Sequence, residues 1–226
     1  MDRTVAPPPR AGQGAAGGAD AMDHPGFPLS LDEVCRRLAA GRAPEPGICP
    51  HTTRAAVALV LRPGPDGPEM LFIERARKEG DPWSGHLAFP GGRLEPSDPD
   101  ARAAAERETL EEVGLDLRGS RFAGEVGTVC GDRLPVTVRC FAYAVGGGEP
   151  LRPNHEVAHA FWVPLGVFLD PSRHLTLRPR FSGADEPEPA VRLAEPHRPV
   201  LWGITYRLVR QFFSRLGLGF PPDARP

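Results

Sequence analysis

The sequence predicts an α/β (α+β) domain in which helices cover the faces of a mixed β-sheet. A continuous apolar run from Ala55 to Leu61 indicates a strand that is buried on both faces. Alanine-rich sequence from about Pro99 to Val113 and apolar residues at helical spacing between Leu201 and Leu216 predict two of the helices. The chain of 226 residues can hold one domain with a sizeable core, and its formal net charge of −2 argues against a nucleic-acid partner.

Residues 1–27 are rich in Ala, Gly and Pro and have no periodic apolar pattern, so we expect a disordered leader. Residues 28–218 are expected to form a single domain, with 219–226 as a tail. Ser30 and Glu33 make a capping box that opens a helix ending at Gly41.

The remaining elements follow from apolar runs and alternation between Gly/Pro-rich turns. A short helix is expected near Gly166–Leu169, and His174–Phe181 with Ala190–Ala194 could form a hairpin. The other predicted strands are Met70–Arg75, Leu87–Phe89, Phe122–Val129, Val136–Val145 and Ala160–Val163.

The cysteines and the hydropathy of the chain indicate the cellular compartment in which the protein resides. Cys35, Cys49, Cys130 and Cys140 lack C-x-x-C spacing and lie among apolar residues, which favours buried reduced thiols over disulfides or zinc. No apolar run approaches the roughly 18 residues that a bilayer span needs, and the start lacks a signal-peptide pattern. We therefore expect a cytoplasmic protein with no membrane partner.

An acidic cluster marks the end of the predicted 99–113 helix. Glu108, Glu111 and Glu112 are three and four residues apart and so share one face. Like charges at this spacing repel, and a hard divalent cation with oxygen ligands would relieve that repulsion. We expect Asp98 to cap the start of this helix and Gly114 to close it.

This segment resembles the Nudix box, the signature of the Nudix hydrolase superfamily. Asp98 stands where the box has a glutamate, and eight residues rather than seven separate it from Arg107. The second half of the box corresponds to the run Arg107-Glu108-Thr109-Leu110-Glu111-Glu112-Val113-Gly114-Leu115.

The residues before the box resemble the coenzyme A pyrophosphatase branch of the superfamily. Members of this branch have an Arg at the end of the preceding strand, where Arg75 stands, and a box of the longer form with aspartates. Their G-x-V-x-F-P-G-G run corresponds here to Gly85-His86-Leu87-Ala88-Phe89-Pro90-Gly91-Gly92.

The resemblance implies an α/β/α sandwich and a site for Mg²⁺ or Mn²⁺. By resemblance, Glu108, Glu111 and Glu112 bind the metal, and the backbone carbonyl of Gly91 adds a ligand. The general base is one of these glutamates or Glu156, from a later loop.

Two interpretations fit each of four further residues. Arg107 either orients the site through an ion pair with Glu111 or is a solvated arginine. Arg75 either holds a phosphate or is a surface charge, and His86 either reaches substrate or is a structural histidine. Glu156 either acts as the general base or only caps its turn.

The leading functional hypothesis is metal-dependent cleavage of coenzyme A or acyl-coenzyme A into 3′,5′-ADP and a 4′-phosphopantetheine product. One alternative is hydrolysis of ADP-ribose, a dinucleotide or a nucleoside triphosphate. A remoter one is a non-catalytic, nucleotide-sensing Nudix protein. All three imply a small-molecule nucleotide partner, and both monomer and homodimer remain open.

Overall fold

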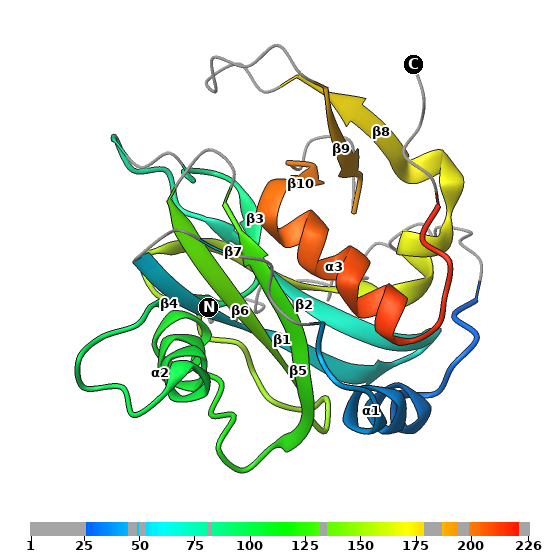
Figure 1. Cartoon of the computed structure of the whole chain (residues 1–226), viewed down its shortest axis with the longest axis horizontal. Coiled ribbons are helices and arrows are strands. Elements are labelled where there is room, and N and C mark those ends of the chain that lie inside the picture. The colour runs from blue at the N-terminus through cyan, green and yellow to red at the C-terminus, as the bar shows by residue number, and fades with distance from the viewer. Residues whose placement is uncertain are drawn as a thin grey trace, which may run out of the picture.

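The computed structural model describes residues 26–44, 49, 53–80, 83–131, 135–178, 187–193 and 199–221. Its helices are α1 (Leu31–Ala40), α2 (Ala101–Val113) and α3 (Gly203–Arg215), with 3₁₀ turns η1 (Leu165–Leu169) and η2 (Pro171–Arg173) (Figure 1). The strands are β1 (Thr53–Gly64), β2 (Gly67–Arg75), β3 (Leu87–Ala88), β4 (Gly91–Arg93), β5 (Arg121–Cys130), β6 (Val136–Ala144), β7 (Val157–Pro164), β8 (His174–Leu177), β9 (Glu188–Val191) and β10 (Leu201–Trp202).

The central sheet is mixed, as the sequence predicts. It has seven strands in the order β3-β2-β1-β6-β5, with β4 also paired to β1 and β7 also paired to β2. The β1–β6 pair is parallel, whereas the β1–β2, β2–β7 and β5–β6 pairs are antiparallel. Since β1 and β6 are parallel, both begin at the same end of the sheet, close to β4.

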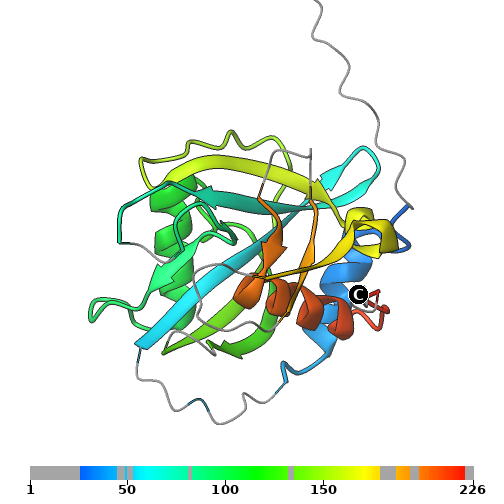
Figure 2. The same cartoon turned by 90° about the horizontal axis from the view of Figure 1, so that it is seen from above.

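Both faces of this sheet are buried, which confirms the reading of the Ala55–Leu61 run. Side chains alternate along β1, so Leu59 and Leu61 face one core while Ala58 and Val60 face the other. The first core is closed by α1 and α3, and the second by α2. Figures 1 and 2 show α2 on the opposite side of the sheet from α1 and α3. This is the predicted sandwich of helices around a sheet.

The first helix forms as its sequence predicts. The Ser30 hydroxyl accepts a hydrogen bond from the backbone N–H of Glu33 at 3.3 Å, and the helix ends before Gly41. Its apolar face buries Val34, Cys35 and Leu38 against the sheet. Among the described residues, no helix has the length and apolar character needed to cross a membrane.

A second, smaller sheet lies beside α3. The predicted hairpin is present, because β8 and β9 pair antiparallel, and β10 adds to β9 just before α3 begins. The loop residues that were included in the hairpin prediction, 179–181, fall outside the described residues, as does 194. So do 1–25 of the expected leader and 222–226 of the expected tail.

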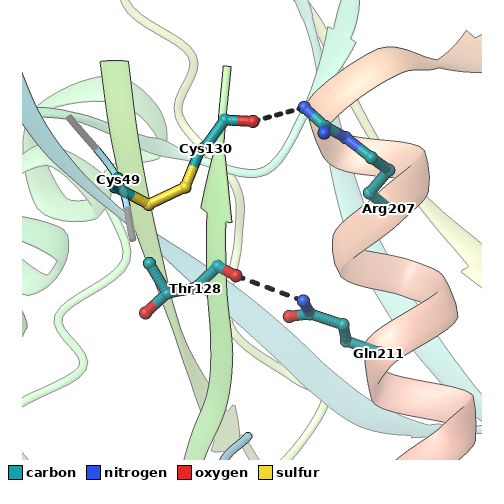
Figure 3. The surroundings of a disulfide bond; sticks show 5 residues. All are labelled: Cys49, Thr128, Cys130, Arg207 and Gln211. Carbon is teal, nitrogen blue, oxygen red and sulfur yellow. Dashed lines mark hydrogen bonds between the residues drawn. A yellow bond between two sulfur atoms is a disulfide. The ribbon is translucent and has the colours of Figure 1, made fainter. Parts of the chain in front are cut away.

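The reduced-thiol reading is wrong for two of the four cysteines. Cys49 and Cys130 form a disulfide, with their Cα atoms 5.7 Å apart (Figure 3). Spacing along the chain could not show this, because 81 residues separate the two and only the sheet brings them together. Cys35 and Cys140 are free and buried, as expected.

Candidate active site

Two glycines bring the backbone of β4 directly against the acidic helix. Gly91 has a φ of 147°, and a Cβ at this position would collide with the backbone of Ala56 and Val57 on β1. A Cβ on Gly92 would collide with the carboxylate of Glu108. Gly91 therefore allows β4 to pair closely with β1, and Gly92 allows β4 to lie directly against the carboxylate of Glu108.

Glu112 is the most buried acidic group of this face. Its side chain is 2% exposed, and one carboxylate oxygen accepts a 2.8 Å hydrogen bond from the backbone N–H of Gly91. The other oxygen lies 3.8 Å from a guanidinium nitrogen of Arg75. Burial raises the pKa of Glu112 to about 7, against the opposing effects of the Gly91 N–H and Arg75 and with added repulsion from Glu108 and Glu156. The site thus holds a carboxyl group that titrates near neutrality.

Glu108 lies one turn before Glu112 on the same helix face. Burial raises its pKa, while the charge of Arg107 and its hydrogen bond lower it, and Glu111 and Glu156 add repulsion. Glu111 differs from these two, because 54% of its side chain is exposed and it turns toward Arg107. The predicted sharing of one helix face is therefore tightest for Glu108 and Glu112.

The donor chemistry fits a hard divalent cation. Burial raises the pKa of both Glu108 and Glu112, and repulsion from neighbouring carboxylates raises it further, so a cation would relieve both penalties. Within the described ranges, however, no three acidic, histidine or cysteine side chains lie close enough together to form a preassembled metal cluster.

Arg107 is held by more partners than the sequence predicts. Its guanidinium bonds Asp98 through two nitrogens, at 3.0 Å each, and also bonds Glu108 at 3.1 Å and Glu111 at 3.4 Å. These bonds, led by those to Asp98, raise the pKa of Arg107. Arg107 therefore links the start of the helix to its acidic face, and the expected contact with Glu111 is the weaker part of this network.

The expectation that Asp98 caps the helix is wrong. Asp100 is the N-cap, since its carboxylate accepts the Ala103 N–H at 2.8 Å, and the helix begins at Ala101. Asp98 instead binds Arg107 and accepts the Glu95 N–H at 2.8 Å, with 5% of its side chain exposed. The hydrogen bond with Arg107 lowers the pKa of Asp98 more than any other contact.

Arg75 and His86 lie side by side where β2 meets the residues before the box. The Arg75 N–H donates to the His86 carbonyl oxygen at 3.0 Å, and the Arg75 side chain points to Glu112. The His86 ring packs edge-on against Trp202 of β10, with ring centroids 5.0 Å apart. The structure therefore places Arg75 at the acidic face and His86 between that face and the second sheet.

Glu156 lies on the loop before β7, close to the other carboxylates. Its charge contributes to the raised pKa values of Glu108 and Glu112. The turn is capped by Asn154, whose side-chain oxygen accepts the Glu156 N–H at 2.8 Å, so the Glu156 carboxylate is not the cap. Asn154 was missed at the sequence level, although Asn two residues before Glu is a recognisable Asx-turn pattern.

This loop is also tied to the end of α2. The backbone N–H groups of Arg152 and Asn154 donate to the carbonyl oxygens of Val113 and Glu112, at 2.8 Å and 2.9 Å. These bonds satisfy carbonyls that the helix end leaves open and fix Glu156 relative to the acidic face. The structure thus brings Glu108, Glu112, Gly91, Arg107, Arg75 and Glu156 into one site.

Comparisons with known proteins agree with this geometry. The family profile described as the NUDIX domain matches residues 51–181, which is more than half of the chain. The chain belongs to the Nudix family.

Two curated proteins are similar to this chain over much of its length. The mitochondrial coenzyme A diphosphatase NUDT8 of Homo sapiens is 32% identical to this chain, over 76% of this chain and 72% of its own length. A Schizosaccharomyces pombe protein is also 32% identical, over 62% of this chain but only 48% of its own length. The match therefore spans about half of the yeast protein.

A solved structure shows the same fold. The MutT/nudix family protein from Enterococcus faecalis superposes with a TM-score of 0.53 at 19% identity, covering 84% of this chain and 70% of that one. This likeness agrees with the mixed sheet and its helices as a Nudix fold.

Proposed function

We propose that this Nudix protein hydrolyses the pyrophosphate bond of coenzyme A or acyl-coenzyme A, giving 3′,5′-ADP and a 4′-phosphopantetheine product. The observation that carries the chemistry is the buried carboxylate of Glu112 beside the Gly91 N–H, with Glu108 one turn away. The coenzyme A assignment is supported by the human relative, a coenzyme A diphosphatase, and by the residues before the box.

Divalent metal, Mg²⁺ or Mn²⁺, belongs to this proposal. Glu108, Glu111 and Glu112 would hold it together with the carbonyl oxygen of Gly91. When bound, the metal screens the pyrophosphate oxygens and makes water a stronger nucleophile. The raised pKa of Glu112 supports this assignment, because that group has the most to gain from a neighbouring cation.

The protein's own residues would divide the remaining work. Arg75, at the end of β2, would neutralise phosphate oxygens and at the same time lower the cost of charge on Glu112. Arg107 would orient Glu108 and Glu111 and acts as a positioning residue. A carboxylate would accept the proton of the attacking water, and we propose Glu156 for this role, or alternatively one of Glu108, Glu111 and Glu112.

His86 is a less direct participant in this scheme. Its ring packs against Trp202 and its carbonyl oxygen holds the Arg75 backbone, so we propose that it positions the substrate-binding strand end. Direct contact with substrate remains the alternative.

A substrate panel tests the proposal. Purified protein with Mg²⁺ or Mn²⁺ should hydrolyse coenzyme A or an acyl-coenzyme A with a higher kcat/KM than ADP-ribose, NADH or nucleoside triphosphates. Preference for another member would reject coenzyme A and leave the family chemistry standing. Tight binding of one member with no turnover of any would favour a nucleotide sensor.

Matched variants separate the acidic face from the rest of α2. Glu112→Gln should lower kcat/KM by at least about a hundredfold, since even outer groups of a metal site cost roughly 10–100-fold when removed. Glu106→Gln is the control, because Glu106 contacts Tyr143 and Arg102 away from the site. Equal activity of the two variants would reject the proposed metal site.

A further inference from the structure

A cavity of about 940 Å³ opens beside the acidic site, where β1 and β6 begin. Its wall is built from the end of α1 and the segment after it, Cys49, the first residues of β1, Leu94, the residues 98–101 at the start of α2, and parts of β5 and β6. It therefore lies at the same end of the sheet as β4 and its glycines.

The cavity and the acidic site share a wall. Asp98 lines the cavity, and its carboxylate binds Arg107, whose guanidinium also contacts Glu108 and Glu111. Arg54, also in the wall, comes three residues before Val57, which pairs with Gly91. An extended strand spaces these positions by about 10 Å, which is within the reach of one nucleotide-sized ligand.

The carboxylates of the wall already have partners. Asp98 is bound by Arg107, and Glu125 is bound by Arg139 through two hydrogen bonds of 2.9 Å and 2.7 Å. Asp100 accepts the Ala103 N–H as the helix N-cap. The acidic groups of the wall are thus engaged within the protein.

Two arginines of the wall differ from these carboxylates, because no partner engages them in the described part of the chain. Across the described stretches of the chain, neither Arg42 nor Arg54 has an ion pair or a side-chain hydrogen bond, and both are exposed. Thr137 is the direct partner of Arg54 in the parallel β1–β6 register, so both side chains project from the same face of the sheet. Its hydroxyl is buried and has no hydrogen-bond partner in that same part of the molecule. Two cations therefore line one cavity, and an unused hydroxyl is buried in its wall.

We infer that this cavity binds a phosphomonoester carried by the substrate itself, namely the 3′-phosphate of coenzyme A or acyl-coenzyme A; this inference rests on the proposed function. Guanidinium groups pair with phosphate oxygens in the fork geometry that suits them, and a threonine hydroxyl adds a neutral donor. The shared wall allows one molecule to present its pyrophosphate to Gly91 and its separate phosphate to Arg54. ADP-ribose and NADH have no such group, so the cavity would determine specificity.

The decisive comparison is coenzyme A against 3′-dephospho-coenzyme A. The wild-type protein should favour coenzyme A in kcat/KM by about tenfold or more, since a hydrogen bond to a charged group contributes roughly that factor. Arg42→Gln combined with Arg54→Gln should remove this preference by raising KM for coenzyme A, with turnover of the dephospho compound unchanged. Arg210→Gln, on the exposed side of α3, is the control for loss of an exposed arginine elsewhere and should keep the preference.

Thr137→Val tests the inference without disturbing the fold. Because the hydroxyl has no partner, its replacement by a methyl group should leave thermal stability equal or higher, yet weaken the preference for coenzyme A. Calorimetric titration with inorganic phosphate and with 3′,5′-ADP adds a binding readout that is independent of turnover.

The outcomes separate the two proposals. A preference that survives in the double variant and in Thr137→Val overturns the cavity assignment, while continued hydrolysis of coenzyme A leaves the proposed function intact. Inorganic phosphate that binds through Arg42 and Arg54 without any substrate preference would indicate a separate effector and would also overturn it. Hydrolysis of neither coenzyme A compound, with turnover of another panel member, rejects the proposed function.

Discussion

Glu112 combines burial, a backbone hydrogen bond and neighbouring negative charge in one carboxyl group. A side chain that is 2% exposed keeps its charge near neutrality only if a cation offsets the desolvation. Arg75 supplies part of this offset at 3.8 Å, and its effect is too small to return the pKa to its ordinary range. A bound divalent ion would offset the rest of the desolvation of the charged Glu112 carboxylate.

The raised pKa of Glu112 has a measurable consequence for folding stability when a chelator keeps the protein free of metal. Because the folded-state pKa is about 7 and the ordinary value is 4.5, the folded protein binds this proton more tightly than the unfolded chain does. The resulting stabilisation is fully present below pH 4.5 and is lost as the pH rises through about 7. The free energy of unfolding of the wild type should therefore fall, relative to Glu112→Gln, by on the order of 3 kcal/mol between these limits.

Denaturant titrations of both proteins across this pH range measure the difference. Saturating Mg²⁺ should reduce the pH dependence of the wild type and leave that of the variant little changed. Parallel stability profiles of wild type and variant in chelator would show that Glu112 titrates normally.

At the scale of single residues, the sequence predicts which side chains share a helix face better than it predicts their hydrogen-bonding partners. Spacing alone places Glu108 and Glu112 on one face, and the structure agrees. The role of Asp98 could not be derived, because Asp98 and Asp100 flank Pro99 and each has a side chain suited to an N-cap. The choice depends on Arg107 reaching back to Asp98 across two turns of helix, a contact that no local pattern contains.

Helices α1 and α3 are joined through their C-terminal ends. The Arg37 guanidinium donates to the Leu216 carbonyl oxygen at 2.6 Å. In the opposite direction, Arg215 donates to the carbonyl oxygens of Leu38 and Gly41, and also to that of Glu125 on β5. The last turn of a helix leaves carbonyl oxygens without hydrogen-bond donors. Here an arginine of each helix donates to carbonyl oxygens at the end of the other helix.

Removing the Arg215 side chain should therefore destabilise the packing of α1 and α3 on the central sheet. We expect Arg215→Ala to lower the free energy of unfolding by about 3 kcal/mol, because the carbonyl oxygens of Leu38, Gly41 and Glu125 lose charge-assisted hydrogen bonds. Thermal or chemical denaturation measures this, with Arg210→Ala as the exposed control on the same helix. Similar losses in both variants would contradict the proposed joint between the helices.

The elements of the fold are largely predictable from local patterns. Alternation in Val136–Val145 and the apolar run of Ala55–Leu61 identify β6 and β1, and Ser30 marks the start of α1. The short strands β4 and β10 were not predicted, since Gly91–Arg93 and Leu201–Trp202 acquire strand character only by pairing with β1 and β9. Pairing between distant segments is a tertiary property.

Across the whole molecule, the Cys49–Cys130 disulfide connects the segment before β1 to the end of β5. The Cys130 carbonyl oxygen also accepts a 2.7 Å hydrogen bond from Arg207 of α3, so three parts of the chain meet there (Figure 3). Disulfides are rare in reducing compartments. The predicted cytoplasmic location therefore stays a prediction, and it loses the argument based on reduced thiols.

The disulfide should stabilise the protein through the unfolded state. Closing a loop with a sequence separation of 81 residues predicts a contribution of about 4 kcal/mol. Replacing both Cys49 and Cys130 by Ala should lower the free energy of unfolding by that amount. Dithiothreitol should bring the wild type to the same value and leave the double variant unchanged; a wild type that does not respond would show that the bond is absent.

The same bond changes the connectivity of the chain. Residues 49–130 form a covalent macrocycle that contains β1 to β5, α2 and therefore the entire acidic helix face. A protease that cuts once inside this ring opens a loop but releases nothing, because the sulfur bridge still joins the two pieces after denaturation. A cut after the ring separates the chain at once, so α3 and the second sheet can be lost by a single cleavage, whereas the acidic face of α2 stays joined to the rest of the ring.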